Sequence, residues 1–165
     1  MVVETSDNGQ PPVEGTEPPE VLARVVNPVM KALLRSPLHR PISSHLMLLS
    51  FRGRKTGRTH KVVVGRHEID GALVVPTGTT GRQWRLNFRG GAPAEVMIEG
   101  KRRRGRGELI EDSEEVTRVH QLLLGRVGLK NARRLGLTVN VNRRPTDDEL
   151  KTTLAGRGVV RIELE

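Results

Sequence analysis

The residues best suited to chemistry lie in a short turn bracketed by two glycines, Gly53-Arg-Lys-Thr-Gly-Arg58. No acidic residue separates the basic side chains in and beside this turn, which are Arg52, Arg54, Lys55, Arg58 and Lys61. Arginine and lysine form charge-assisted hydrogen bonds with phosphate and carboxylate oxygens, and glycine frees the backbone to present N–H groups. The pattern predicts an anion-binding site, although a hairpin tip with merely solvated charges would have the same residues.

A second group of residues could hold the ring of a cofactor. The glycine-rich loop Thr77–Arg82 carries hydroxyl groups and precedes Gln83–Arg89, a short predicted helix with Trp84 and Phe88 on one side. A long, anionic, planar cofactor could place its charged tail on the basic turn and its ring between this loop and this helix. For Trp84 the alternative is ordinary core packing. For Lys101–Arg104 we favour a solvated strand tip.

The sequence offers no nucleophile or metal site of its own. It contains no cysteine, which excludes disulfides, thiolate metal ligands and thiol nucleophiles. It matches none of the Walker A, G-x-G-x-x-G, H-E-x-x-H and G-x-S-x-G patterns. The histidines are scattered along the chain, at His39, His45, His60, His67 and His120. We therefore expect no catalytic side chain and no metal ligand, and any redox activity would depend on a bound organic cofactor.

The charge is strongly basic and unevenly distributed. The 165-residue chain has a formal net charge of +9, but none of its 28 basic residues and five of its 19 acidic ones lie in residues 1–20. The remaining residues therefore carry a net charge of +14, which suits nucleic acid, acidic lipid headgroups or a phosphorylated small molecule. Two Phe, one Trp and no Tyr leave few stacking platforms, so we expect no specific nucleic-acid binding.

Composition and periodicity divide the chain into a tail and one domain. Residues 1–19 are acidic and contain four prolines, which predicts a disordered tail. A single domain is predicted over residues 20–165, a length that can bury a sizeable core. It opens with an apolar helical stripe in Glu20–Arg35, interrupted at Pro28 and ended by Pro37 and Pro41.

Strand patterns dominate the residues that follow. Leu46–Arg66 has the pattern of a hairpin around the basic turn. The turn signal Asp70-Gly71 joins His60–Ile69 to Ala72–Pro76, which predicts a three-stranded antiparallel meander. The other predicted strands are Ala94–Glu99, Arg102–Glu111 and Val159–Leu164, and two further helices are predicted to begin at Asp112 and Thr146. About six mostly antiparallel strands with flanking helices indicate a β-rich α+β fold, whose sheet we expect to curl toward a barrel.

Two blocks of the sequence resemble the deazaflavin-dependent nitroreductase family. The first is the basic turn, and the second, more specific block is Trp84-Arg-Leu-Asn87 followed by Phe88-Arg-Gly-Gly-Ala-Pro93. The resemblance runs from about Asn27, with Ser36-Pro-Leu-His39 before the first strand, to the C-terminus. Members of this family have a split β-barrel fold related to the barrels that bind flavin mononucleotide (FMN). The resemblance therefore implies a split β-barrel for this chain.

The same resemblance implies binding of coenzyme F420, a hydride carrier with a phosphate and a polyglutamate tail. The residues it implies are Arg54, Lys55, Thr56, Gly57 and Arg58 for the phosphate and tail, Pro76, Thr77 and Gly78 beside the ring, and Trp84 and Asn87 closing the pocket. The chain departs from many members at Val62–Gly65, where they have a proline, and at Arg85, where they have an aromatic residue. It also lacks the pocket tyrosines used by members that reduce nitroaromatics.

Our leading hypothesis is an F420-dependent oxidoreductase that delivers hydride to a small conjugated acceptor, namely a quinone, an enone or a nitro compound. The alternatives are an FMN-dependent reductase on the same fold and a non-catalytic module that binds a cofactor, haem or lipid. The chain has no apolar stretch near the roughly 20 residues that span a bilayer and no signal-peptide pattern. We expect a cytoplasmic monomer or homodimer, with at most weak association with an anionic membrane surface.

Overall fold

The computed structural model describes residues 9–16, 32, 45–78 and 84–165 of the chain. These residues divide into two compact units, where the sequence predicted one domain from residue 20. We call the first the helical unit; its described residues fall within 9–16, 76–78 and 111–158. The second, the sheet unit, comprises residues 45–75, 84–110 and 159–165.

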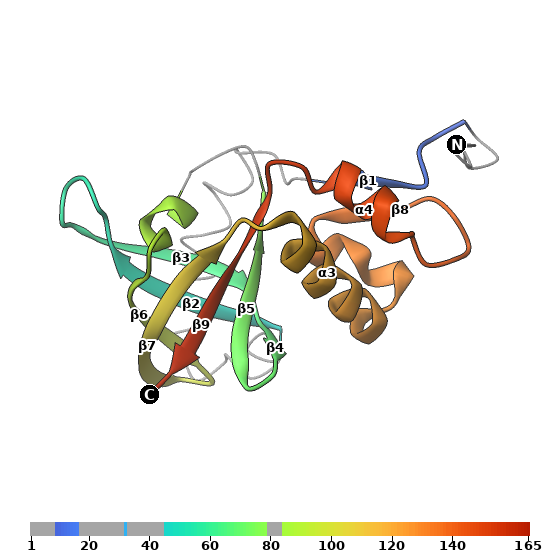
Figure 1. Ribbon diagram of the computed structural model, residues 1–165. Coiled ribbons are helices and arrows are strands. Elements are labelled where there is room, and N and C mark those ends of the chain that lie inside the picture. Colours follow the sequence, from blue (N-terminus) through green and yellow to red (C-terminus); the bar gives the residue numbers. More distant parts are fainter. Residues whose placement is uncertain (1–8, 17–31, 33–44, 79–83) are drawn as a thin grey trace. The chain divides into compact units, whose positions relative to one another are not determined.

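A seven-stranded sheet supplies most of the sheet unit (Figure 1). Its strands, in spatial order, are β3 (Thr59–Gly65), β2 (Leu46–Arg52), β6 (Ala92–Ile98), β7 (Lys101–Ile110), β9 (Gly158–Leu164), β5 (Ala72–Thr77) and β4 (His67–Ile69). The β2–β3, β2–β6, β6–β7, β7–β9 and β4–β5 pairs are antiparallel. This sheet confirms the predicted β-rich α+β class, with one strand more than expected.

The predicted hairpin around the basic turn is confirmed. Strands β2 and β3 pair from Leu46 opposite Gly65 to Arg52 opposite Thr59, which leaves Gly53–Arg58 as the connecting turn. The chain can reverse there because Gly57 has a φ of +67°, a conformation that glycine adopts without steric cost. The hairpin therefore fixes the position of every basic side chain in the turn relative to the sheet.

One face of this sheet forms the hydrophobic core. Successive side chains of a strand point to opposite faces, so Met47, Leu49 and Phe51 of β2 all enter the core while Ser50 and Arg52 face away from it. The remaining buried members of the cluster are Val64, Leu73, Val75, Phe88, Ala94, Val96, Leu109, Val160 and Ile162. The short 3₁₀ helix η2 (Trp84–Phe88) packs Phe88 into the same core and matches the helix predicted over Gln83–Arg89.

The predicted meander is wrong in one respect. The turn at Asp70 and Gly71 joins β4 to β5 as expected, with φ values of 53° and 77°. However, the strand expected over His60–Ile69 breaks at Arg66, and its two halves become β3 and β4 at opposite ends of the sheet order. Alternation changes phase across this break, since Val62 and Val64 occupy even positions and the buried Ile69 an odd one, and the prediction of one strand overlooked that change.

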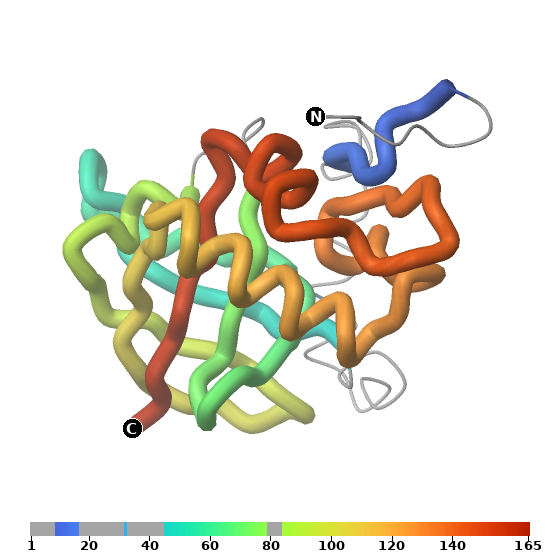
Figure 2. The backbone as a smooth tube through the Cα atoms, turned by 45° about the vertical axis from the view of Figure 1, so that its right-hand side comes forward, coloured from blue at the N-terminus to red at the C-terminus, as the bar shows by residue number. Residues whose placement is uncertain are grey.

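The helical unit contains the helices expected at Asp112 and Thr146 (Figure 2). Helix α3 (Ser113–Val127) begins where the Asp112 side chain accepts the N–H of Glu115 at 3.0 Å, and α4 (Asp147–Thr153) begins with a capping box between Thr146 and Glu149. The 3₁₀ helix η3 (Leu129–Leu135) follows α3, and a two-stranded antiparallel sheet joins β1 (Val13–Gly15) to β8 (Leu137–Val139). Neither η3 nor this small sheet was predicted.

Strand β1 corrects the expectation of disorder through residue 19. Val13 is only 3% exposed, and the hydroxyl of Thr153 donates to its carbonyl at 3.1 Å. A single buried valine within an acidic, proline-rich stretch gives no alternation from which a strand could be predicted. Apart from residue 32, the helix predicted over Glu20–Arg35 lies outside the described residues, as do the Ser36–His39 motif and the proposed boundary at residue 20.

Candidate functional site

The basic turn presents its cations to solvent. Arg54, Lys55 and Arg58 are exposed, and none of them has an ion-pair partner within the described part of the chain. The flanking Arg52 is also exposed, while Lys61 is half-buried on β3. Charged side chains that lack a neighbouring carboxylate are free to bind an anion from outside.

The backbone of the turn is less available than the sequence suggested. The N–H groups of Gly53 and Gly57 donate to Arg58 O and Gly53 O, both at 2.8 Å. The N–H of Arg58 donates to the Thr56 hydroxyl at 3.3 Å, and the N–H of Arg54 donates to the Asn87 side chain at 2.7 Å. Because these internal bonds occupy most of the turn's donors, an anion would be held mainly by side chains rather than by a cradle of backbone N–H groups.

Asn87 connects the two blocks of sequence that were singled out as candidate sites. Its Oδ1 accepts the Arg54 N–H, and its Nδ2 donates to the carbonyl of Trp84 at 2.7 Å. Both ends of this amide are therefore occupied within the protein. The family resemblance implies that Asn87 closes a pocket, which stays a prediction; in the structure Asn87 links the turn to η2.

Trp84 belongs to an aromatic cluster beside the turn. Its ring lies 5.9 Å from Phe51 and 6.1 Å from Phe88, the latter in an edge-to-face arrangement. Phe51 also stacks on His60 at 5.7 Å and meets Phe88 edge-on at 5.3 Å. Phe51 and Phe88 are buried but Trp84 is only half-buried, so it packs against the core and still presents part of its ring to solvent.

The remaining predicted residues, Pro76, Thr77 and Gly78, belong to the helical unit. The hydroxyl of Thr77 donates to the carbonyl of Gly158 at 2.9 Å, and Thr77 is 7% exposed. That hydroxyl therefore has a structural partner. Pro76 and Gly78 are half-buried. The structure thus brings together the turn, Trp84 and Asn87 within one unit, and it leaves the 76–78 segment in the other.

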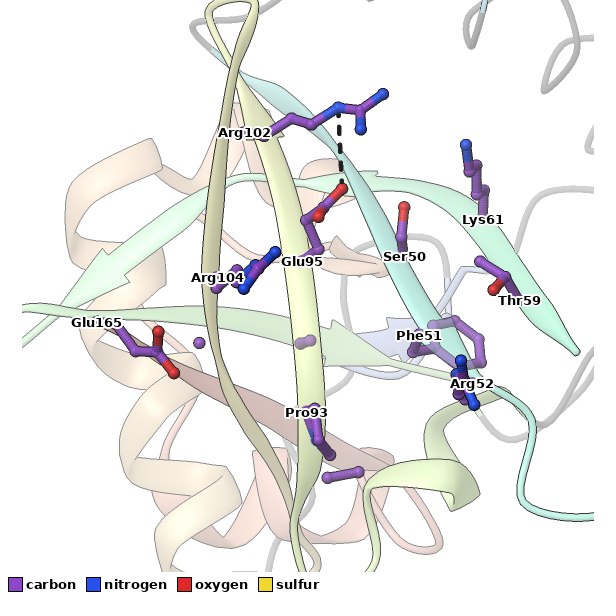
Figure 3. A pocket seen from close by; sticks show the side chains of 13 residues that line it. Ser50, Phe51, Arg52, Thr59, Lys61, Pro93, Glu95, Arg102, Arg104 and Glu165 are labelled. Atoms are coloured by element: carbon purple, nitrogen blue, oxygen red, sulfur yellow. Dashed lines mark ion pairs between the residues drawn. The ribbon is translucent and has the colours of Figure 1, made fainter. Parts of the chain in front are cut away.

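A pocket of about 540 Å³ lies on the sheet unit and was not predicted (Figure 3). Its lining residues come from β2, β3, β6, β7 and the end of the chain: Ser50, Phe51, Arg52, Thr59, Lys61, Ala92, Pro93, Ala94, Glu95, Arg102, Arg104, Gly105 and Glu165. The run Lys101–Arg104, which the sequence assigned to a solvated strand tip, supplies two of its arginines. Only the register of four strands, which no single motif encodes, brings these residues together.

We also searched the described residues for metal-binding clusters and for membrane-spanning helices. No group of three or more His, Asp or Glu side chains among them could hold a metal ion. None of the helices that the structure describes is long and apolar enough to cross a membrane.

Sequence comparison found no matching family model and no similar curated protein. Structure comparison found a pyridoxamine 5'-phosphate oxidase-related, FMN binding protein from Nostoc punctiforme, with 12% identity, a TM-score of 0.51 and coverage of 83% of this chain and 78% of that one. The fold is a split β-barrel. At this identity the likeness establishes the fold alone, as the sequence resemblance implied.

Two further solved structures resemble this chain less closely, with TM-scores below 0.5. A putative pyridoxamine 5'-phosphate oxidase from Listeria innocua has 12% identity and a TM-score of 0.47, covering 83% of this chain and 94% of its own. An F420-H2 dependent reductase has 14% identity and a TM-score of 0.42, covering 72% of this chain and 93% of its own.

Proposed function

We propose that this split-barrel protein is an oxidoreductase that uses coenzyme F420 to transfer hydride to a small conjugated acceptor, a quinone, an enone or a nitro compound. The observation that carries the proposal is the basic turn, where Arg54, Lys55 and Arg58 are exposed and have no carboxylate partner among the described residues. Asn87 fastens this turn beside the partly exposed ring of Trp84.

The donor set fits the anionic part of this cofactor. A phosphate and a chain of glutamates carry several negative charges, and three neighbouring cations on a fixed turn match such a group better than a single charge would. Arg54, Lys55 and Arg58 would bind the phosphate and tail, and the Thr56 hydroxyl can still donate because it only accepts from Arg58 N–H. Gly57 would give the turn its shape.

The ring would lie against the aromatic cluster of the sheet unit. Trp84 would contact it with the exposed part of its side chain, and Asn87 would hold the turn and Trp84 in register. That Pro76, Thr77 and Gly78 contact the ring stays a prediction from the sequence resemblance, and the Thr77 hydroxyl is already bonded to the carbonyl of Gly158. When bound, the deazaflavin supplies the hydride chemistry; the protein binds and orients it and provides no nucleophile.

Titration with each cofactor tests the proposal. Purified protein mixed with F420 and then desalted should retain the deazaflavin absorbance, and F420 should bind more tightly than FMN. Equal or tighter FMN binding would favour the rival FMN-dependent reductase, and retention of neither would leave a different binding module. A cytoplasmic location and a monomeric or homodimeric state are part of the same proposal.

A further inference from the structure

The pocket shown in Figure 3 lies on the sheet face opposite the hydrophobic core. Ser50 and Arg52 point to this face because they alternate with the core residues Leu49 and Phe51 along β2. Pro93 is the exposed apolar side chain of the lining; Phe51, Ala92 and Ala94 also line the pocket, but their side chains belong to the core cluster or pack against it. Its volume, about 540 Å³, lies within the roughly 300–1,000 Å³ of typical small-molecule sites.

A row of polar side chains crosses the pocket from strand to strand. Lys61 on β3 is directly opposite Ser50 on β2, and Ser50 is opposite Glu95 on β6. Glu95 in turn is opposite Arg104 on β7, whose carbonyl accepts the N–H of Glu165 at 3.0 Å. Neighbouring strands are about 4.8 Å apart, so the row from Lys61 to Arg104 spans about 14 Å, a length that one organic ligand and the long basic side chains can cover together.

The charges in this row do not neutralise one another. Residues directly opposite on adjacent strands usually pair opposite charges, yet the structure describes no ion pair for Arg52, Lys61 or Arg104. The one ion pair recorded in the pocket joins Arg102 Nε to a Glu95 oxygen at 3.9 Å, and both side chains are exposed. Such a long, exposed pair is weak. The lining has four cations, Arg52, Lys61, Arg102 and Arg104, against the two carboxylates of Glu95 and Glu165, which leaves an excess of positive charge.

We infer that this pocket binds a small organic anion with an apolar body, at a site beside the basic turn that does not include Arg54, Lys55 or Arg58. Arg52, Lys61 and Arg104 surround the ligand and attract its anionic group, and its apolar body covers Pro93 and the neighbouring strand backbone. Glu95 limits affinity for anions, because its carboxylate repels the ligand while offering an acceptor to a ligand hydroxyl or amide. The inference does not depend on the cofactor proposed above.

Fluorescence titration with anilinonaphthalene sulfonate tests the site, because this probe combines an apolar ring system with one negative charge. The uncharged N-phenylnaphthylamine has the same apolar body and serves as the matched probe. The sulfonate should bind at one site per chain and more tightly than the neutral probe. Equal affinity for the two probes would show hydrophobic adsorption and would overturn the inference.

Single substitutions locate the site. Arg104→Gln should weaken sulfonate binding about threefold to tenfold, whereas Glu95→Gln should strengthen it about twofold to fivefold. Arg103→Gln removes the same charge from the neighbouring position on the opposite face of β7 and should change affinity little. If Arg104→Gln fails to fold, Lys61→Gln provides the same test from β3.

The opposite outcomes contradict the inference in separate ways. Unchanged binding in both Arg104→Gln and Lys61→Gln would mean that the probe lies elsewhere. Weaker binding in Glu95→Gln would mean that the pocket does not select anions. A loss in Lys55→Ala as large as in Arg104→Gln would mean that the pocket and the turn form one site.

Discussion

The side-chain amide of Asn87 accepts the backbone N–H of Arg54 at 2.7 Å across 33 residues of sequence. The same amide donates to the carbonyl of Trp84, also at 2.7 Å. The basic turn is therefore attached to a 3₁₀ helix whose Phe88 is fully buried, and its cations are held near the half-buried Trp84. A turn that was attached only to its own two strands would be freer to move.

Removing this amide should loosen the turn. In Asn87→Ala, the Arg54 N–H loses its acceptor, so hydrogen exchange at the Arg54 amide should become faster than in the wild type. Each lost hydrogen bond contributes about 0.5–1.5 kcal/mol, so the free energy of unfolding should fall by about 1–3 kcal/mol. Amide exchange followed by NMR and urea unfolding measure the two effects.

Asn142→Ala is the matched control, since Asn142 is exposed and no hydrogen bond of its side chain is recorded in the described structure. It should change neither the Arg54 exchange rate nor stability. An unchanged Arg54 exchange rate in Asn87→Ala would show that the turn keeps its shape without this link.

Sequence patterns predicted the parts of the fold that depend on local chemistry. Two helix starts were identified from Asp112 and Thr146, whose side chains satisfy backbone N–H groups within three residues. The break at Arg66 and the strand at Val13 were missed, since their cause is pairing with residues far away in the sequence. Tertiary pairing can override local pattern in this way.

The candidate site could also be predicted only where its residues are close together in the sequence. The cations of the basic turn are contiguous in sequence, and so they could be recognised together. The Arg54–Asn87 bond and the row from Lys61 to Arg104 depend on strand register, which the sequence does not state. Which of the predicted residues contact a cofactor stays a prediction.

Lys55 provides the most direct test of the cofactor tail. If its ammonium contacts a phosphate or carboxylate, Lys55→Ala removes about 1.5–3 kcal/mol of binding free energy, a roughly tenfold to hundredfold weaker Kd for F420. Affinity should also fall with added salt, since exposed charges are screened beyond about 8 Å at physiological ionic strength. Titration at two salt concentrations measures both effects.

Lys101→Ala is the control for this prediction, because Lys101 is equally exposed but lies at the start of β7. Both variants should fold, as neither side chain is buried. Wild-type affinity in Lys55→Ala together with a loss in Lys101→Ala would place the cofactor tail on the other hairpin.

The N-terminal strand should contribute to stability, contrary to what the sequence composition suggested. Deleting residues 1–16 removes the buried Val13, the β1–β8 pairing and the bond from Asn140 Nδ2 to Pro11 O, which measures 2.9 Å. Burial of the valine alone accounts for about 1.5–3 kcal/mol. The melting temperature of this variant should fall by several degrees.

Deletion of residues 1–8 is the control, because it leaves β1 in place. This variant should melt within about one or two degrees of the wild type. Equal melting temperatures of the two deletion variants would contradict a stabilising role for β1.

The start of α4 makes stability depend on pH through Glu149. Arg143 Nη2 donates to Glu149 Oε1 at 2.8 Å, and Arg143 Nη1 donates to Oε2 at 3.0 Å. The Thr146 N–H also donates to Oε2, at 2.9 Å. The Arg143 hydrogen bonds, with a smaller effect from Thr146, hold the pKa of Glu149 below its usual value, although partial burial opposes the shift.

Glu149→Gln should therefore destabilise the protein at neutral pH and matter less in acid. A carboxyl whose pKa is lowered on folding contributes stability above its unfolded pKa of about 4.3, and this contribution is lost as the pH falls through the lower folded value. The glutamine amide can still accept the Thr146 N–H, so the variant loses mainly the partly exposed Arg143 ion pair, about 0.2–1 kcal/mol of the free energy of unfolding at pH 7. Thermal melts from pH 7 down to pH 3 should show the melting temperatures of the wild type and Glu149→Gln converging in the acid range.

Glu108→Gln is the control. It changes an exposed carboxylate on β7 that has no ion pair among the described residues, and it should melt like the wild type at every pH. A stability difference in Glu149→Gln that stays constant down to pH 3 would show that the amide disrupts packing and that the Arg143 ion pair contributes little.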